Sequence, residues 1–240
     1  MPAPTWAGAE HLDRLIMIGT PNAGSAKSLL TLVEGVHIAP FLPTYEAALL
    51  GTMPAIYQLM PRDRHGALVD AQTDESITGL YDAARWQQMA WGLASPEPDE
   101  LLKVLLPNAA DAAERRRIAQ DHLAKCLARA EQLHAALDVA STPPPGVEIH
   151  LFAGDSEGTA AIVAVDPATG WVWVREHGPG DGTVLRTSAV MDERLDGDWT
   201  PRLRTPIAWT SVRFLFQDHL GLTKDAQFTD NVLYLLIEAP

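Results

Sequence analysis

Segments with the character of buried strands lie towards the two ends of this chain, and the residues between them show almost no strand character. The first is the apolar run 13–19, which ends at Gly19, and strand character returns only at 147–153. A short apolar run bounded by turn residues is typical of a strand that is buried on both faces of a parallel sheet. We therefore expect residues 40–140 to form an insertion that separates two strand-rich flanks.

The insertion has helical rather than strand patterning. Helices are expected near 44–60, 76–93, 98–105 and 109–139. In the last of these, apolar residues recur at steps of three and four, which is typical of one buried helix face. The members of this stripe are Ala119, Leu123, Cys126, Leu127, Ala130, Leu133 and Leu137.

The second flank is predicted to be strand-rich and to end in a helix. The runs 160–165 and 171–175, separated by a turn, indicate a β-hairpin, and 206–216 is a further apolar, β-rich run. A final helix is expected over 224–237, with Thr223 as its N-cap. Its predicted buried stripe consists of Phe228, Val232, Leu235 and Leu236.

Composition excludes several classes of protein. The chain has 240 residues, with 18 basic and 31 acidic side chains, so its net charge is 18 − 31 = −13. That charge argues against binding nucleic acid or an anionic membrane surface. The single cysteine, Cys126, excludes an intrachain disulfide, and no spacing of histidines or carboxylates indicates a metal or cofactor site. There is no signal peptide and no apolar run long enough to span a membrane, so we expect a cytoplasmic protein if Met1 is the natural start.

Three short segments carry residues suited to catalysis. They are 18–25, directly after the first strand, 180–184, after the hairpin, and 217–222, between the last strand and the last helix. Loops at the carboxyl ends of strands converge on the active site in an open α/β sheet. Asp181 on one loop and His219 on a later loop reproduce the acid-before-histidine order of the α/β-hydrolase triad.

With these motifs the sequence resembles the α/β-hydrolase lipases and acyltransferases, and within them the lecithin:cholesterol acyltransferase-like group. The matching segments are Gly19-Thr20-Pro21-Asn22-Ala23-Gly24-Ser25, Gly180-Asp181-Gly182-Thr183-Val184 and the histidine before the final helix. The resemblance implies an incomplete α/β-hydrolase-like sheet with a helical cap, or lid. It implies a hydrolase core over 1–39 and 141–240, with the cap at 40–140. It further implies that Asp181 is the catalytic acid and His219 the catalytic base.

The chain departs from that group at the nucleophile. The resemblance places a G-x-S-x-G elbow well before the G-T-P segment, yet only 18 residues precede Gly19 and none is serine. We therefore expect the nucleophile upstream of this chain, with Met1 as a misassigned start. The alternative is a truncated, inactive hydrolase-like protein that serves as a binding or interaction module, with an exposed sheet edge prone to self-association.

One serine inside the chain has the elbow pattern, in Gly154-Asp155-Ser156-Glu157-Gly158. An elbow needs a strand before the serine and a helix after it. Residues 159–167 are β-branched and end in a turn, which favours a simple strand-end turn at Ser156.

The predicted activity is that of a serine esterase, lipase or O-acyltransferase acting on an apolar, lipid-like ester. The aromatic and sulfur-containing residues Tyr81, Trp86, Met89 and Trp91 either line an acyl-chain pocket or form the core of the cap. Residues of this kind on a cap helix more often form the core of the cap, which favours the second alternative.

Overall fold

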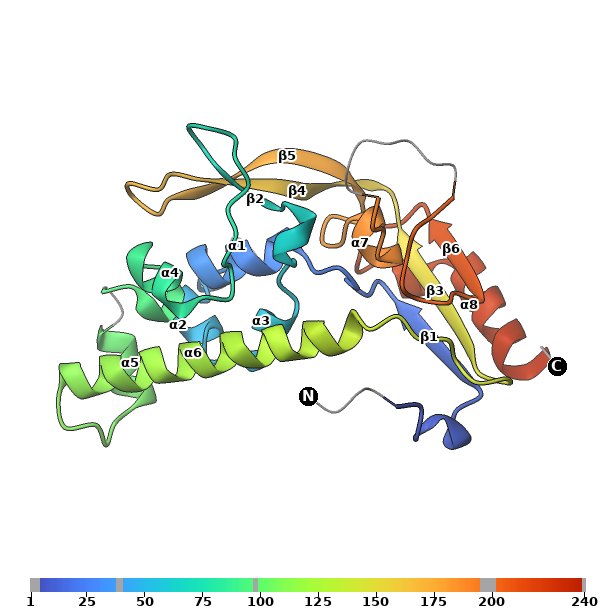
Figure 1. The fold of residues 1–240 in the computed structure, drawn as a ribbon, viewed down its shortest axis with the longest axis horizontal. Coiled ribbons are helices and arrows are strands. Elements are labelled where there is room, and N and C mark those ends of the chain that lie inside the picture. Colours follow the sequence, from blue (N-terminus) through green and yellow to red (C-terminus); the bar gives the residue numbers. More distant parts are fainter. Residues whose placement is uncertain (1–4, 38–40, 97–98, 195–201, 239–240) are drawn as a thin grey trace. The chain divides into compact units, whose positions relative to one another are not determined.

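The chain folds into two compact units. A computed structural model of the chain describes residues 5–37, 41–96, 99–194 and 202–238 (Figure 1). The first unit consists of Met1–Ser25, Ala136–Ala161 and Glu176–Pro240, and the second of Ala26–Ala135 and Ile162–Arg175. The boundaries predicted at 39/40 and 140/141 stay a prediction.

The first unit is built on a three-stranded parallel sheet. Its strands are β1 (Arg14–Ile18), β3 (Glu148–Gly154) and β6 (Ser211–Leu215), in the order β1-β3-β6. Both pairings are parallel. The two strands predicted from apolar runs, 13–19 and 147–153, are thus confirmed, and the structure pairs them despite their separation in sequence. The run 206–216 forms a strand only in its last part.

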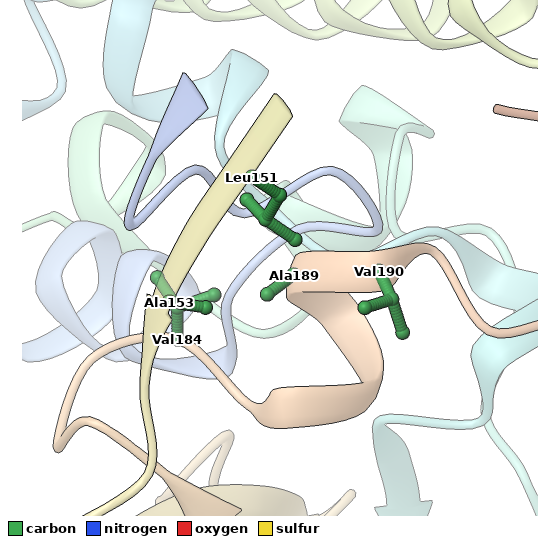
Figure 2. Packing of buried hydrophobic residues seen from close by; sticks show 5 residues of the cluster. All are labelled: Leu151, Ala153, Val184, Ala189 and Val190. Atoms are coloured by element: carbon green, nitrogen blue, oxygen red, sulfur yellow. The ribbon is translucent and has the colours of Figure 1, made fainter. Parts of the chain in front are cut away.

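A small apolar cluster covers one face of this sheet (Figure 2). Its helix is α7 (Arg186–Val190), whose Ala189 and Val190 are buried with residues of β3. The opposite face packs against α8 (Ala226–Leu233) and the π-helical turn η5 (Tyr234–Glu238). The buried members of that second cluster are Phe152, Leu215, Leu222, Phe228 and Leu235. The sheet is therefore covered on both faces, as its apolar strands predict.

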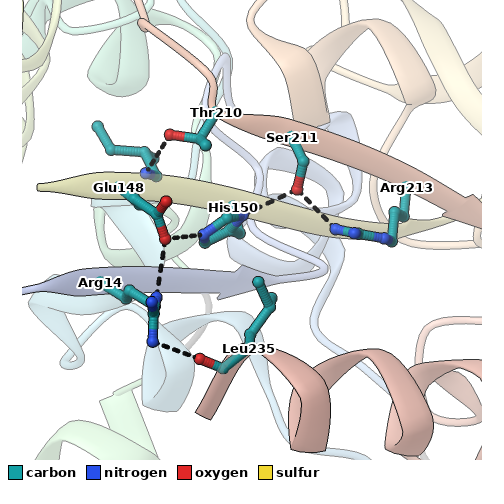
Figure 3. A network of polar contacts seen from close by, with 8 residues as sticks. Arg14, Glu148, His150, Thr210, Ser211, Arg213 and Leu235 are labelled. Atoms are coloured by element: carbon teal, nitrogen blue, oxygen red, sulfur yellow. Dashed lines mark hydrogen bonds and ion pairs between the residues drawn. The ribbon is translucent and has the colours of Figure 1, made fainter. Parts of the chain in front are cut away.

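A polar network crosses the sheet within the second face (Figure 3). His150 is buried, and its Nδ1 lies 2.8 Å from Ser211 Oγ while its Nε2 lies 3.1 Å from Glu148 Oε2. Arg14 Nε donates to the same Glu148 oxygen at 2.7 Å. Hydrogen bonds from Arg14 and His150 hold the pKa of Glu148 below its ordinary value. Because Arg14 is paired with Glu148 and His150 with Ser211 across the sheet, the network favours this register.

The second unit is mainly helical. Its helices are α1 (Ala26–Glu34), α2 (Ala47–Leu50), α3 (Pro54–Gln58), α4 (Ala83–Gln88), α5 (Asp99–Leu105) and most of α6 (Ala112–Leu137), with 3-10 turns η2 (Asp63–His65) and η3 (Gly92–Ala94). Further 3-10 turns, η1 (Ala9–His11) and η4 (Leu222–Lys224), belong to the first unit. Helices at 98–105 and 109–139 are confirmed almost at their predicted bounds. The stretch 44–60 forms two short helices, because Pro54 begins a new helix at its N1 position.

The predicted hairpin is confirmed and is longer than expected. It consists of β4 (Glu157–Val165) and β5 (Val172–Gly180), and the sheet order is β2-β4-β5. The short strand β2 (Leu68–Asp70), which was not predicted, pairs in parallel with the end of β4. Both hairpin strands contribute residues to both units.

Several local predictions were wrong. Thr223 does not cap the last helix: α8 begins at Ala226, and Asp225 is its N-cap, accepting hydrogen bonds from the backbone N–H of Gln227 and Phe228. Leu236 is exposed rather than buried. The predicted stripe on α6 is buried as far as Ala130, whereas Leu133 and Leu137 are exposed.

The neighbouring residues Leu235 and Leu236 provide a matched test of the packing. Leu235 is 4% exposed within the apolar cluster, and Leu236 is 62% exposed. We expect Leu235→Ala to lower the free energy of unfolding by about 2–5 kcal/mol, because it leaves a cavity in the core. Leu236→Ala should stay within about 0.5 kcal/mol of the wild type. Urea unfolding followed by circular dichroism measures both, and equal effects of the two substitutions would contradict this packing.

Candidate active site

The three segments that the sequence marks for catalysis come together in the first unit. Ser25 Oγ donates to the Thr183 carbonyl at 2.5 Å, and the backbone N–H of Ala23 donates to the Ser188 carbonyl at 3.1 Å. The backbone N–H of His219 donates to the Asp181 carbonyl at 2.9 Å. Hydrogen bonds therefore tie the loop after β1 and the loop after β6 to the segment that carries Asp181.

Asp181 lies at the centre of this arrangement and is 2% exposed. Its Oδ1 accepts hydrogen bonds from the backbone N–H of Thr183 at 2.9 Å and of Val184 at 2.7 Å. Its Oδ2 lies 2.9 Å from His219 Nδ1. Both carboxylate oxygens therefore have donors, which offsets the cost of burying the charge.

The charge of Asp181 is favoured by its surroundings. Burial by itself raises the pKa of the carboxyl group, but the hydrogen bonds from His219, Val184 and Thr183 lower it. The net result is a pKa below the ordinary value for aspartate. Asp181 is therefore ionised at neutral pH, where it can orient an imidazole ring.

His219 is held by the acid at one nitrogen and is partly open to solvent. Its side chain is 33% exposed, in contrast to 1% for the side chain of Asp181. A hydrogen on Nδ1, donated to Asp181, leaves Nε2 with a lone pair for accepting a proton. Among the described residues, no serine forms a hydrogen bond with His219.

Two glycines make room for this pair. Gly19 has φ of +57°, and a Cβ there would lie 3.0 Å from Cε1 of His219. A Cβ at Gly154, at the end of β3, would lie 2.6 Å from Cβ of Asp181 and 2.3 Å from the Gln217 carbonyl oxygen. The sequence marks Gly19 as the end of a strand but gives no sign of the role of Gly154, which only the tertiary contacts reveal.

Thr159 is another supporting residue that sequence reasoning missed. It is 2% exposed, and its Oγ1 accepts a hydrogen bond from the backbone N–H of Gly182 at 2.8 Å. Thr159 lies on β4, so the hairpin fixes the backbone directly after Asp181. A buried threonine in a strand has no distinctive sequence signal, because strands are rich in β-branched residues.

The serines near this site are engaged elsewhere or lie in the wrong context for an elbow. Ser25 and Ser188 each donate to a backbone carbonyl, Ser188 to that of Gly24 at 2.6 Å. Ser156 lies in a bend between β3 and β4, and β4 begins at the next residue. A strand, and not a helix, therefore follows Ser156, as the sequence predicts.

The four residues considered for an acyl-chain pocket form part of the core of the second unit. Trp86, Met89 and Trp91 are buried, and the rings of the two tryptophans meet edge to face with centroids 5.6 Å apart. Tyr81 lies 3.0 Å from Nδ1 of His134 through its hydroxyl group. Of the two alternatives, the cap-core interpretation is the one that this packing supports.

Over residues 5–37, 41–96, 99–194 and 202–238, no cluster of three or more His, Cys, Asp or Glu side chains is arranged to hold a metal ion. In the same part of the chain, no helix has both the length and the apolar character that crossing a bilayer requires.

Comparison with known proteins identifies the fold but not a family. No family model matches the sequence, and no curated protein does either. The structure is similar to a chain in the crystal structure of the Tle4–Tli4 complex, with a TM-score of 0.59 and 18% identity. The alignment covers 96% of this chain and 55% of that one, so this chain spans little more than half of the protein it matches.

The comparison corrects the family suggested by the sequence motifs. The assignment to the lecithin:cholesterol acyltransferase-like group was wrong, because the structural likeness leads to the Tle4–Tli4 complex and no family model supports that group. The coarser prediction of a mixed α/β fold agrees with the two small sheets and with this likeness.

The low pKa of Asp181 leads to a pH-dependent prediction. We expect Asp181→Asn to lower the free energy of unfolding by about 1–3 kcal/mol at pH 7, because buried donors lose a charged acceptor. The native pKa is depressed, so this stabilisation is present above the unfolded value of about 3.9 and is lost as pH falls through the native value. Urea unfolding at pH 7 and near pH 3 measures the difference, and an equal difference at both pH values would count against the assignment.

The contact of Gly19 with the His219 ring can be tested with Gly66 as the control, because Gly66 has a similar positive φ and more space around it. Gly66 has φ of +60°, but a Cβ there would come no nearer than 4.0 Å to Ser76 Oγ. We expect Gly19→Ala and Gly66→Ala each to cost about 1 kcal/mol of stability through positive φ. Only Gly19→Ala should move the NMR signals of the His219 ring. If neither substitution shifts those signals, the contact between Gly19 and the ring is not as described.

Proposed function

We propose that this chain carries the histidine base and the orienting acid of a serine hydrolase that acts on apolar, lipid-like esters. The observation that carries the proposal is the 2.9 Å contact between Asp181 Oδ2 and His219 Nδ1, formed between a buried acid and a partly exposed histidine. This is the acid–base half of a hydrolase triad. The serine nucleophile is expected upstream of the 240 residues.

In this mechanism, His219 Nε2 takes the proton of the serine hydroxyl as its oxygen attacks the ester carbonyl. The protonated ring then gives that proton to the leaving alcohol, which leaves an acyl-enzyme. Asp181 keeps the hydrogen on Nδ1 and stabilises the imidazolium that forms. Water completes hydrolysis, whereas an acceptor hydroxyl completes O-acyl transfer, and water access decides between them.

Two observations support an upstream nucleophile. The matched chain extends well beyond this one, which aligns with 55% of its length. In addition, β1 is an edge strand of its sheet, and Leu15 and Ile18 are 38% and 41% exposed. An edge strand with exposed apolar side chains is a template for a further strand. A strand added there would extend the parallel sheet next to Gly19, where a Cβ would lie 3.0 Å from Cε1 of His219.

The apolar character of the substrate is favoured by the residues around the base. Phe216 and Leu220 flank His219 in sequence and are 84% and 82% exposed. Exposed apolar side chains of this size next to a catalytic pair suit an acyl chain or another apolar ester. The proposal includes residues 40–140 as a lid over such a substrate, and this role stays a prediction.

The test is labelling with a fluorophosphonate, read by intact mass. We expect the 240-residue chain to give no adduct, and the product of the whole reading frame that contains it to be labelled on a serine outside these residues. In that longer protein, Asp181→Asn should reduce ester hydrolysis by about 10⁴-fold and His219→Ala by at least as much.

The exposed His177 on β5 serves as the matched control, and His177→Ala should leave hydrolysis within about twofold of the wild type, as expected for a surface substitution. An adduct on Ser156 in the 240-residue chain would overturn the upstream nucleophile. A folded longer protein that neither reacts nor hydrolyses esters would favour the alternative, a hydrolase-like binding module.

A further inference from the structure

The second unit contains a cavity beside α6 that no step of the proposed reaction uses. Its volume is about 290 Å³, close to the lower end of the range for small-molecule sites, roughly 300–1,000 Å³. The apolar residues that line it come from η3, α5, the turn after α5, and α6. They are Leu93, Leu102, Leu105, Leu106, Ile118 and Ala119.

A second, more polar groove lies further along α6 and shares one residue with the first cavity. The groove has a volume of about 460 Å³, and its lining includes His122, Lys125 and Arg129. His122 also lines the apolar cavity, and its Nε2 lies 3.2 Å from the Thr52 carbonyl oxygen. The imidazole ring therefore stands where an apolar space meets a groove that carries basic side chains.

The two basic side chains of the groove, Lys125 and Arg129, differ in whether a carboxylate pairs with them. Lys125 forms an ion pair with Asp121 at 2.6 Å, which offsets its charge. Arg129 is exposed, and its contact is with the neutral amide oxygen of Gln132 at 3.3 Å. Among the residues that the structure describes, no carboxylate pairs with Arg129, so its guanidinium group is available to an anionic ligand.

From this juxtaposition we propose that the second unit binds a single-chain amphiphile with an anionic head group. The aliphatic chain occupies the apolar cavity, and the head group lies at His122 and Arg129. Filling the cavity restores the dispersion contacts that its lining lacks, and a guanidinium group forms strong, charge-assisted hydrogen bonds with carboxylate or phosphate. A free fatty acid and a lysophospholipid with an anionic head share this chemistry. The inference does not depend on the proposed catalytic role of Asp181 and His219.

The experiment is calorimetric titration of the 240-residue chain with dodecanoate below its micellar concentration. We expect one saturable site with a Kd of about 100 µM or tighter, which an aliphatic ligand of this size reaches at ordinary efficiency. Parallel titrations with 1-dodecanol and 1-dodecanoyl lysophosphatidate test the head group. Tighter binding of dodecanoate than of lysophosphatidate identifies the fatty acid as the better ligand, and the reverse order identifies the lysophospholipid.

Substitutions in the groove and in the apolar cavity test the two halves of the site separately. Arg129→Gln should weaken dodecanoate binding by about tenfold or more while leaving dodecanol unchanged, because only dodecanoate carries a charge. Arg117→Gln, an exposed arginine on the same helix that lines neither cavity, is the matched control and should change neither affinity. Ala119→Leu, which fills the apolar cavity, should weaken both ligands by about tenfold or more.

If circular dichroism shows that Ala119→Leu is unfolded, Leu106→Trp replaces it. Leu106 lines the same cavity and is only half-buried, so a larger side chain there can fill the cavity. The proposal is overturned if dodecanoate does not bind, or if a folded cavity-filling variant binds it as tightly as the wild type. Equal effects of Arg129→Gln and Arg117→Gln, or equal affinity for dodecanol and dodecanoate, would also overturn it.

Discussion

The double pairing of β3 is the constraint on which the first unit depends. β3 forms parallel ladders with β1 on one edge and β6 on the other, and every residue from Ile149 to Gly154 is buried. A central strand of this kind leaves no backbone hydrogen-bonding group exposed, so its position fixes the positions of its neighbours. At its last residue, Gly154, a Cβ would lie 2.6 Å from Cβ of Asp181 and 2.3 Å from the carbonyl oxygen of Gln217, and the loop that contains Gln217 carries His219. The geometry of the acid–histidine pair is therefore set by the end of β3.

Much of this arrangement follows from the sequence because its signals are local. The apolar runs that become β1 and β3, and the turn residues that end them, fix where the loops at the carboxyl ends of the strands begin. The general rule that such loops converge also predicted the approach of Asp181 to His219, although Asp181 follows β5, which belongs to the other sheet. The parts that the sequence did not reveal depend on tertiary contacts. β2 has only three residues, Leu68–Asp70, and becomes a strand through its pairing with Val163–Val165. Arg115 lies on the polar face of α6 and is nevertheless buried. Its burial is tolerated because Asp99 of α5 pairs with the guanidinium group at 3.0 Å.

The wrong family assignment has a physical explanation of the same kind. The segment 19–25 and the segment 180–184 are short, and glycine, threonine and aspartate in them satisfy the requirements of tight turns and close backbone approach. Gly19 makes room for an imidazole ring, and the Asp181 carboxylate caps the backbone of Thr183 and Val184. Any hydrolase-like fold that holds an acid and a histidine at the ends of its strands meets the same requirements. Motifs of this length therefore indicate a type of site and a type of fold, but they carry too little information to indicate one family.

The side chains of Asp181 and His219 differ in exposure as their proposed roles of orienting acid and general base require. The Asp181 side chain is almost fully buried and has donors on both oxygens, so its charge is fixed in place. The His219 side chain is one-third exposed, and Phe216 and Leu220 beside it are exposed to a far greater extent. A general base must be accessible to the group whose proton it takes. The acid that orients the base works best when it is shielded from water, because electrostatic interactions are stronger in a medium of low dielectric constant. In the proposed reaction, a substrate or polypeptide that covers His219 would remove water from the face of the ring that accepts the proton.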